Sequence, residues 1–308
     1  ESEVMKVAQI GLGKIGSILA EHLMNDSTVD LSVYDKDIDR LGAFPDAAAR
    51  SESVAAASKG CDFFLVSLPD PTAARMAMFA DDGILASAVP GVTILDLSTI
   101  DPQTAREIHQ KASALGVHYV EAPISGGEPM SAGTEGAKNR NVTFMAGGDA
   151  VGFERAKPLM EKLGRFPIHV GPAGMGATVK LISNYISGLH NVVAAEAFVL
   201  GKAAGIDAKL LFDVFKHTDA NSYWLFNYFA PRIEQRNFEP GFSVDLQYKD
   251  LRLADELARE LKVPMPLNAA AIQVYQTLRA VGRGTKDVVE VANLVAEMAG
   301  QESYLLSK

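Results

Sequence analysis

Residues 4–16 read Val-Met-Lys-Val-Ala-Gln-Ile-Gly-Leu-Gly-Lys-Ile-Gly, an apolar β-rich run that leads directly into three glycines spaced G-x-G-x-x-G. A pattern with helical periodicity follows the last glycine to about Met24. A strand, a glycine turn and a helix in immediate succession are typical of the first crossover in a mainly parallel sheet. The stretch therefore predicts an α/β fold for the N-terminal half of the chain.

Each glycine of this turn has its own physical reason. Gly11 allows a tight turn, Gly13 lets the backbone approach a pyrophosphate, and Gly16 lets the helix pack closely on the strand. The start of the helix offers free N–H groups and partial positive charge to phosphates. A plain strand–helix turn is the alternative, but Asp35 stands 19 residues beyond Gly16, at the end of a second short strand over 31–34. That spacing favours a dinucleotide site.

Asp35 also bears on the choice of dinucleotide. Its carboxylate would accept hydrogen bonds from an adenosine ribose and would repel a 2′-phosphate, which favours NAD over NADP. Lys36 and Arg40 stand nearby and weaken that preference. The alternative for Asp35 is a solvated residue at a strand end.

Further apolar runs indicate the rest of the sheet, at 63–67, 92–97, 117–121, 142–145 and 166–170. Helical segments of roughly 10–15 residues separate the earlier runs, which predicts a mainly parallel sheet with helices on both faces. Ser67-Leu68-Pro69 and Ser98-Thr99 follow two of these runs, at the edge where such sheets bind ligands. Ordinary turn chemistry is the alternative for both.

The pattern of the sequence changes at Gly174. From there the chain shows almost no strand signal, and we expect helices over 176–204, 208–217, 222–235, 244–262, 267–281 and 286–299. We therefore predict two domains, a sheet-containing domain over 1–172 and an all-helical domain over 173–308.

The helix that opens the second part is apolar around its whole circumference, which predicts a buried helix. Lys180, Asn184, Ser187 and Asn191 nevertheless form one polar stripe along it, at i, i+4, i+7 and i+11. A buried ammonium is costly unless it is paired or used. The alternative is a lysine whose stem lies on apolar surface while its head reaches water. The stripe, together with the nucleotide site, favours a functional lysine.

Bulk composition restricts the partners. The chain has 308 residues and a net charge of −9, which argues against nucleic acid or an anionic membrane surface as a partner. Cys61 is the only cysteine, so an internal disulfide and a cysteine metal cluster are excluded, and we expect a buried, inert thiol. No metal site is predicted. No apolar stretch reaches the ~18–20 residues that span a bilayer. The acidic start at residues 1–3 shows no signal peptide, and we expect a cytoplasmic protein.

Two more segments carry polar groups, one directly after a predicted strand and the other at the start of a predicted helix. Residues 122–127, Ala-Pro-Ile-Ser-Gly-Gly, follow the fifth predicted strand, and we expect a loop whose N–H groups and serine hydroxyl surround a carboxylate. A glycine turn before another strand is the alternative. Residues 242–251 open a later helix that contains Lys249-Asp250, by default a surface ion pair that contributes little.

In combination, these segments resemble the β-hydroxyacid dehydrogenase family, whose best-known member is 3-hydroxyisobutyrate dehydrogenase, over essentially the whole chain. The resemblance is carried, in order, by Gly11–Gly16, Asp96–Thr99, Ala122–Gly127, Gly174-Met175-Gly176 with Lys180 and Asn184, and Lys249–Leu251. It implies a Rossmann-type NAD-binding domain joined to a helical domain by a long helix. It also implies a small-molecule carboxylate as substrate, and assembly into a homodimer or homotetramer.

The resemblance also implies roles for single residues. Lys180 would be the general acid/base. The residues that would bind the substrate are Ser125, Gly126, Gly127, Asn184, Thr99, Phe242 and Asp250. Those that would bind the cofactor are Gly11, Leu12, Gly13, Lys14, Ile15, Gly16, Asp35, Leu68, Pro69, Thr99 and Lys249.

Two segments depart from the family pattern. Residues 128–141 are longer than the family's connection by roughly half a dozen residues, which leaves the identity of the substrate open. Residues 217–224 also differ. Within them, Asn221 and Trp224 either reach the substrate or, for the tryptophan, belong to the core or a subunit interface.

The functional hypothesis is reversible oxidation of a small β-hydroxy acid of the 3-hydroxyisobutyrate type by NAD. One alternative is a reductase of a small aldehyde acid, such as tartronate semialdehyde, succinic semialdehyde or glyoxylate. Another is a non-catalytic NAD-binding protein, against which Lys180 and Asn184 argue. A methyltransferase would leave the helical second domain unexplained.

Overall fold

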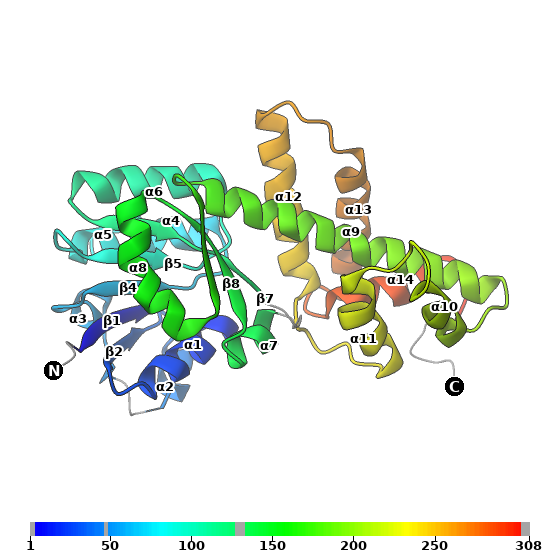
Figure 1. Ribbon diagram of the computed structural model, residues 1–308, viewed down its shortest axis with the longest axis horizontal. Coiled ribbons are helices and arrows are strands. Elements are labelled where there is room, and N and C mark those ends of the chain that lie inside the picture. The colour runs from blue at the N-terminus through cyan, green and yellow to red at the C-terminus, as the bar shows by residue number, and fades with distance from the viewer. Residues whose placement is uncertain (1–3, 46–48, 127–132, 303–308) are drawn as a thin grey trace. The chain divides into compact units, whose positions relative to one another are not determined.

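The apolar runs of the first half pair into one nine-stranded sheet in the computed structural model, which describes residues 4–45, 49–126 and 133–302 (Figure 1). The strand order is β3-β2-β1-β4-β5-β6-β8-β7, and β9 also pairs with β8. The strands are β1 Met5–Ile10, β2 Val29–Tyr34, β3 Ala49–Arg50, β4 Phe63–Val66, β5 Thr93–Asp96, β6 His118–Glu121, β7 Ile124–Gly126, β8 Val142–Gly147 and β9 Phe166–Gly171.

The sheet is mainly parallel, as predicted. Neighbouring strands from β3 to β6 all run parallel, whereas β8 is antiparallel to both β6 and β7. In the register of β5 and β6, Asp96 lies beside Glu121. Two acidic residues therefore end adjacent strands at the carboxyl edge of the sheet.

Helices cover both faces, which explains why the strands are almost continuously apolar. On one face, α1 (Lys14–Met24), α7 (Gly133–Lys138) and α8 (Ala150–Leu163) pack in one core with side chains such as Val7, and Leu41 of α2 (Ile38–Ala43) joins them. On the other face, α3 (Val54–Ala57), α4 (Pro71–Phe79), α5 (Ile84–Ser87) and α6 (Pro102–Ala114) pack in a second core with side chains such as Ala8.

Part of the connection that departs from the family pattern is helical. Residues 128–132 lie outside the described residues, and 133–138 form α7. Ala137 is buried in the first core, and its carbonyl oxygen lies 2.8 Å from His22 Nε2 of α1.

Helix α9 runs from Met175 to Ala203 as one uninterrupted element. Of the described residues, those up to 126 and 133–180 form one compact unit and those from 181 onward form a second, so the chain passes between the units within α9. The domain limits 1–172 and 173–308 remain predictions.

The prediction that α9 is buried all round is wrong. Val179, Ile182, Ile186, Val193 and Leu200 are between 37% and 72% exposed. Their spacing of three, four or seven residues puts these aliphatic side chains on one face of the helix. An apolar composition thus marks a helix with one uncovered face, and not one surrounded by protein.

The second unit is helical, as predicted, and its described residues 181–302 contain no strand. One isolated bridge joins Ser243 and Asp287. After α9 come α10 (Ala208–Phe215), the π-helix η1 (Leu225–Phe229), α11 (Ala230–Glu234), α12 (Val244–Glu260), α13 (Pro266–Ala280), the 3-10 turn η2 (Val288–Glu290) and α14 (Val291–Met298).

The helix expected over 222–235 is not uniform. Its middle widens into η1, where the Ala230 N–H donates to the Leu225 carbonyl. Pro231 has no N–H to donate to the preceding turn, which is the local reason for the interruption. Within the described residues no helix combines the length and apolar character needed to cross a bilayer.

Candidate active site

The glycine turn joins the carboxyl end of β1 to α1, as predicted. Gly11 has a φ of +100°, and a Cβ there would stand 2.2 Å from the Ser67 carbonyl oxygen. A Cβ at Gly16 would stand 2.3 Å from the Gly11 carbonyl oxygen. These two positions therefore require glycine for packing. Gly13 differs, because nothing lies within 4 Å of the place its Cβ would take, and no side chain caps the N-terminus of α1 there.

Gln9 holds this turn in shape and was missed by the sequence analysis. It is fully buried, and its Nε2 donates to the carbonyl oxygens of Gly16 at 2.5 Å and Gly11 at 3.3 Å. The available signal was a lone polar residue in an apolar strand, two positions before the turn. A buried amide is kept in such a place only when it is hydrogen-bonded.

Asp35 is buried at the end of β2 and is tied to the turn. Its Oδ2 accepts from the Leu12 N–H at 2.7 Å, and its Oδ1 accepts from the Asp37 N–H at 2.8 Å. Each carboxylate oxygen has a further lone pair to offer a ligand. The structure thus brings Asp35 and the predicted cofactor residues of 11–16 together.

The loops after β4 and β5 are also joined. Ser98 Oγ accepts from the Leu68 N–H at 2.9 Å, and Asp96 Oδ1 accepts from the Ser98 N–H at 2.9 Å. Asp96 Oδ2 accepts from the Tyr119 hydroxyl at 3.0 Å. Burial raises the pKa of Asp96 above its usual value. The predicted residues Leu68, Pro69 and Thr99 therefore follow strand ends whose loops the Ser98 hydroxyl joins, and the buried Asp96 carboxyl group holds Ser98 in place.

Ser125 and Gly126 do not lie in a loop, which corrects the prediction. They belong to β7, where they pair with Thr143 and Val142 of β8. The Met145 N–H donates to the Pro123 carbonyl, so β8 continues past Pro123 as the partner of the whole segment. The third predicted residue, Gly127, lies outside the described residues.

Lys180 and Asn184 lie one turn apart on α9, and both are buried, with exposed fractions of 8% and 6%. Asn184 Nδ2 donates to Asp250 Oδ2 at 2.5 Å. Lys249 Nζ lies 3.1 Å from Asp250 Oδ1. The expectation of a surface ion pair is wrong, since the side chain of Asp250 is 1% exposed and that of Lys249 20%. The structure therefore groups Asn184, Lys249 and Asp250.

Phe242 stands just before α12, packed against the core of the second unit. Its N–H donates to the fully buried carboxylate of Asp287, which also accepts from the Tyr228 hydroxyl at 2.7 Å.

The C-terminal end of the polar stripe contributes to the packing of the helical unit. Asn191 Oδ1 accepts from Trp224 Nε1 at 2.9 Å, and the Trp224 ring stacks on Tyr228 at 4.3 Å between centroids. Asn221 is exposed, and its side chain donates to the Lys216 carbonyl. Trp224 thus belongs to the packing of the helical unit.

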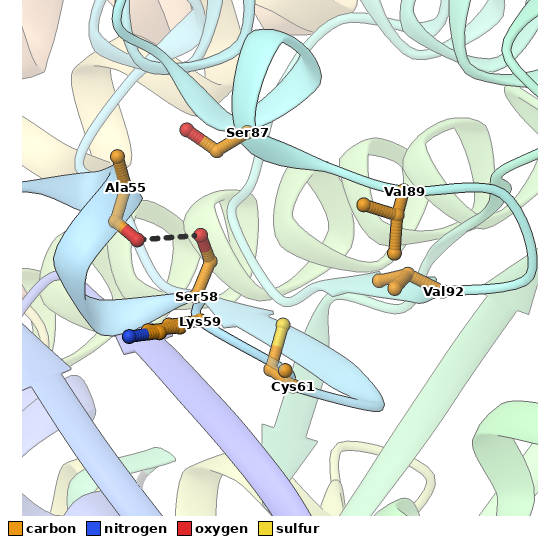
Figure 2. A pocket seen from close by; sticks show the side chains of 8 residues that line it. Ala55, Ser58, Lys59, Cys61, Ser87, Val89 and Val92 are labelled. Carbon is orange, nitrogen blue, oxygen red and sulfur yellow. Dashed lines mark hydrogen bonds between the residues drawn. The ribbon is translucent and has the colours of Figure 1, made fainter.

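A cavity of about 280 Å³ opens at the other edge of the sheet, beside Cys61 (Figure 2). Cys61 lies two residues before β4 and Val92 lies one residue before β5, so this cavity is at the amino ends of these parallel strands. The glycine turn is at the opposite, carboxyl edge of the sheet. Burial, with a contribution from Asp62, raises the pKa of the Cys61 thiol to about 11. The thiol is buried, as expected, and the cavity lies at the edge of the sheet opposite the glycine turn.

No group of three or more histidine, cysteine or acidic side chains suited to a metal ion occurs among residues 4–45, 49–126 and 133–302.

Comparison with known proteins gives two family matches. Residues 6–175 match a family model described as the NAD binding domain of 6-phosphogluconate dehydrogenase. Residues 174–295 match one described as NAD-binding of NADP-dependent 3-hydroxyisobutyrate dehydrogenase.

Relatives match along nearly the full chain. An NAD-dependent L-serine dehydrogenase from Pseudomonas aeruginosa is 34% identical over 305 residues, covering 96% of this chain and 99% of that protein. A 3-sulfolactaldehyde reductase from Escherichia coli is 31% identical, covering 96% and 97%. The solved structure of a 3-hydroxyisobutyrate dehydrogenase from Mycobacterium tuberculosis with L-serine has a TM-score of 0.84 at 28% identity, covering 94% and 99%.

The relatives are named as dehydrogenases and reductases, but their named substrates differ. With its glycine turn, its acidic strand end and these matches, the chain belongs to the 3-hydroxyisobutyrate dehydrogenase-like family of NAD-dependent β-hydroxyacid dehydrogenases and reductases.

Proposed function

We propose that this oxidoreductase transfers a hydride between NAD(H) and a small β-hydroxy acid, with Lys180 as the general acid/base. The observation that carries the proposal is a buried ammonium-bearing side chain near the start of α9, one turn before a buried amide, in a chain of this family.

The residues of the first unit fit a dinucleotide. The open space at Gly13 and the uncapped start of α1 offer room and N–H donors to a pyrophosphate. Asp35 would accept from the adenosine ribose, and its charge disfavours a 2′-phosphate, so we propose NAD over NADP. We assign Leu12, Lys14, Ile15, Leu68, Pro69 and Thr99 of this unit to the same cofactor site, and we propose Lys249, which belongs to the second unit, as a further cofactor-binding residue. When bound, the nicotinamide takes up or supplies the hydride.

Ser125, Gly126 and Gly127 would hold the substrate carboxylate. The serine hydroxyl and backbone N–H groups are donors suited to that anion. Asn184, with Asp250 fixing its amide, would orient the substrate, and Thr99 and Phe242 would line its pocket. Holding the acid group in this way limits which carbon can react.

Lys180 would move the proton that accompanies the hydride. In oxidation its neutral amine accepts the hydroxyl proton, and the substrate becomes a carbonyl compound. In reduction its ammonium donates a proton to the oxygen that becomes the alcohol. Acid–base assistance of this kind typically contributes about 10²–10⁴-fold to a rate.

A second candidate is the reduction of a small aldehyde acid, of the tartronate semialdehyde, succinic semialdehyde or glyoxylate type. The similarity to a 3-sulfolactaldehyde reductase favours it, because that enzyme's name describes an acidic aldehyde. The same residues would serve, with Lys180 starting as the ammonium.

We also propose a homodimer or homotetramer, supported by the uncovered aliphatic residues of α9. A cytoplasmic location is proposed from the single, buried cysteine, because a reducing compartment does not select for disulfides.

The test is a substrate panel. Purified enzyme is assayed for NAD⁺ reduction with 3-hydroxyisobutyrate, L-serine and other C3 and C4 β-hydroxy acids, and for NADH oxidation with the aldehyde acids. Both sets are repeated with the phosphorylated cofactor. We expect turnover with at least one hydroxy acid and a preference for NAD. Tight NADH binding with no turnover in either direction would favour a non-catalytic protein instead.

A further inference from the structure

Glu121, the last residue of β6, is fully buried and reaches the start of α9. Its Oε1 accepts from the Gly174 N–H at 2.5 Å and from the Gly176 N–H at 3.3 Å. Gly174 directly precedes α9 and Gly176 lies in its first turn, where backbone N–H groups have no partner within the helix. A carboxylate placed there makes charge-assisted hydrogen bonds and meets the positive end of the helix dipole.

Three backbones are brought together around this carboxyl group. Gly147 of β8 is the register partner of Glu121, and a Cβ at Gly147 would stand 2.0 Å from Glu121 Oε1 and 2.7 Å from the Gly176 nitrogen. A Cβ at Gly176 would stand 2.2 Å from the Met145 carbonyl oxygen. Two glycines therefore make the space in which β6, β8 and α9 share one side chain.

The surroundings of the Glu121 carboxyl group disfavour its charged form. Its Oε2 has no hydrogen-bond partner among the described residues. Burial raises the pKa of Glu121 to about 7; three backbone N–H groups, its own and those of Gly174 and Gly176, oppose that rise, and the neighbouring Asp96 of β5 adds to it. A buried acid with one oxygen atom that accepts no hydrogen bond is costly to retain, so its position needs a reason.

The other ionisable groups around it are few. Tyr119 on β6 donates to Asp96, and Arg106 of α6 reaches the space beside Gly174. His169 of β9 is bonded to the Gly148 carbonyl. From Val142 to Gly147 of β8, and in α9 before Lys180, no titratable side chain occurs.

We propose that Glu121 is a positioning residue for Lys180, clamping the first turn of α9 to the end of β6. Lys180 lies one helical turn beyond Gly176, and Ser125 and Gly126 follow β6 directly along the chain. One carboxylate therefore sets the register between the helix that carries the ammonium and the segment proposed to hold the substrate acid group. The proposal rests on the role of Lys180 proposed above.

We propose that Glu121 holds the first turn of α9 most strongly when its carboxyl group is ionised. An ionised carboxylate accepts the two N–H bonds more strongly than a neutral carboxyl group does. Protonation relieves the desolvation cost of the buried charge but weakens these two hydrogen bonds, so the local hold on the first turn of α9 loosens. Small displacements at a reacting group cost rate steeply. The rate should therefore rise as Glu121 loses its proton.

The experiment compares Glu121→Gln, which keeps the shape and removes the charge, with Asp149→Asn as matched control. Asp149 caps α8 in the same unit, where its carboxylate accepts from the Gly152 N–H at 2.6 Å, and it is not one of the proposed site residues. We expect kcat of Glu121→Gln to fall about tenfold to a hundredfold, with the Kd for NADH within about twofold of the wild type. The control should match the wild type in both.

The pH profile separates positioning from general destabilisation. The wild-type kcat should carry an ionisation near the pKa of about 7, and Glu121→Gln should lack it. Loss of NADH affinity in proportion to kcat, or an unchanged kcat and profile in folded Glu121→Gln, would overturn the proposal.

A double variant distinguishes this proposal from the one on which it rests. If Glu121 acts through Lys180, Glu121→Gln adds no further loss to Lys180→Ala. Equal losses in both backgrounds would remove Glu121 from the mechanism, whereas near-normal turnover of Lys180→Ala alone would overturn the role of the lysine.

A measurement on the wild-type protein does not depend on any variant folding. In ¹⁵N-glycine-labelled enzyme, the amide signals of Gly174 and Gly176 should move together with one midpoint as Glu121 titrates. Amides that stay unmoved between about pH 4 and about pH 9 would show that the carboxyl group does not act on α9.

Discussion

Lys180 combines two properties that seldom occur together, an ammonium group and near-complete burial. Burial of that group is costly unless the protein uses or pairs it. Lys202 lies on the same helix in its last turn, and its Nζ donates to the Glu302 carbonyl at 3.0 Å near the surface. The two lysines thus form a natural comparison along one element.

Lys180→Ala should lower kcat by about 10²–10⁴-fold while leaving the NADH Kd nearly unchanged, because only the proton transfer loses its partner. Steady-state kinetics and NADH fluorescence titration provide the measurement, and Lys202→Ala is the control, with wild-type kinetics expected. Turnover of Lys180→Ala close to that of the wild type would show that another group moves the proton.

Asp35 should govern the choice between cofactors. Asp35→Asn keeps the side-chain size but removes the charge that repels a 2′-phosphate, so the ratio of kcat/KM for NAD⁺ over NADP⁺ should fall about tenfold. Asp62→Asn is a suitable control, since that carboxylate accepts from the Lys6 N–H before β4, at the amino edge of the sheet. An unchanged ratio in Asp35→Asn would mean that other groups select the cofactor.

Glu121 should make stability depend on pH. Its folded-state pKa of about 7 lies above the ordinary 4.5, so between these values the folded protein holds a proton that the unfolded chain has released. Stability of the wild type therefore falls as pH rises through this window, by about 3 kcal/mol relative to Glu121→Gln. Urea midpoints from about pH 4.5 to about pH 8 measure it, and parallel curves for the two proteins would refute the shift.

At the scale of elements, the glycine turn shows that neighbouring backbone determines which glycines of a motif are required for packing. Gly11 and Gly16 are required by the backbone of the turn and of the loop after β4, whereas Gly13 borders open space. The same motif thus contains two glycines that packing requires and one, Gly13, that borders open space and that we propose for pyrophosphate binding. The spacing alone does not distinguish them.

Gly13→Ala and Gly16→Ala should therefore fail differently. The first should keep its stability and lose NADH affinity, because its new Cβ enters the space available to a pyrophosphate. The second should lose about 1–3 kcal/mol of stability or more, because its Cβ stands 2.3 Å from the Gly11 carbonyl oxygen. Thermal unfolding and NADH titration of both variants check this, and a reversed pattern would contradict the assignment.

The short strand β7 shows where element prediction ends. A segment of three residues is too short for its periodicity to predict a strand. The hydrogen bonds that make β7 a strand come from its partner β8. The π-helix η1 was not predicted either, although Pro231, which has no N–H to donate, indicated that the hydrogen bonds of the helix would be interrupted there.

At the scale of the whole molecule, the uncovered aliphatic row of α9 bears on assembly. A row of exposed apolar side chains on one helix face marks a site of association. We expect light scattering to give a homodimer or homotetramer. Ile186→Asp, which puts a charge in the row, should shift the mass toward the monomer, while Lys209→Asp on exposed α10 should not. A wild-type monomer at micromolar concentration would refute the prediction.

The amino-acid sequence by itself determined the alternation of strands and helices, the glycine turn with Asp35, the change to helices at Gly174 and the family. These are encoded in windows of a few to about thirty residues, where periodicity and turn chemistry act directly. The predicted site residues could be named in the same way, but their partners could not.

Only the tertiary structure decided which distant groups meet. It paired Asn184 with Asp250, 66 residues apart, buried the Lys249–Asp250 pair, and set Asp96 beside Glu121 at the ends of adjacent strands. It also placed the Glu121 carboxyl group against α9, 53 residues further along the chain. Such contacts arise from the pairing and packing of whole elements, and a local pattern carries no information about which strand or helix will lie opposite.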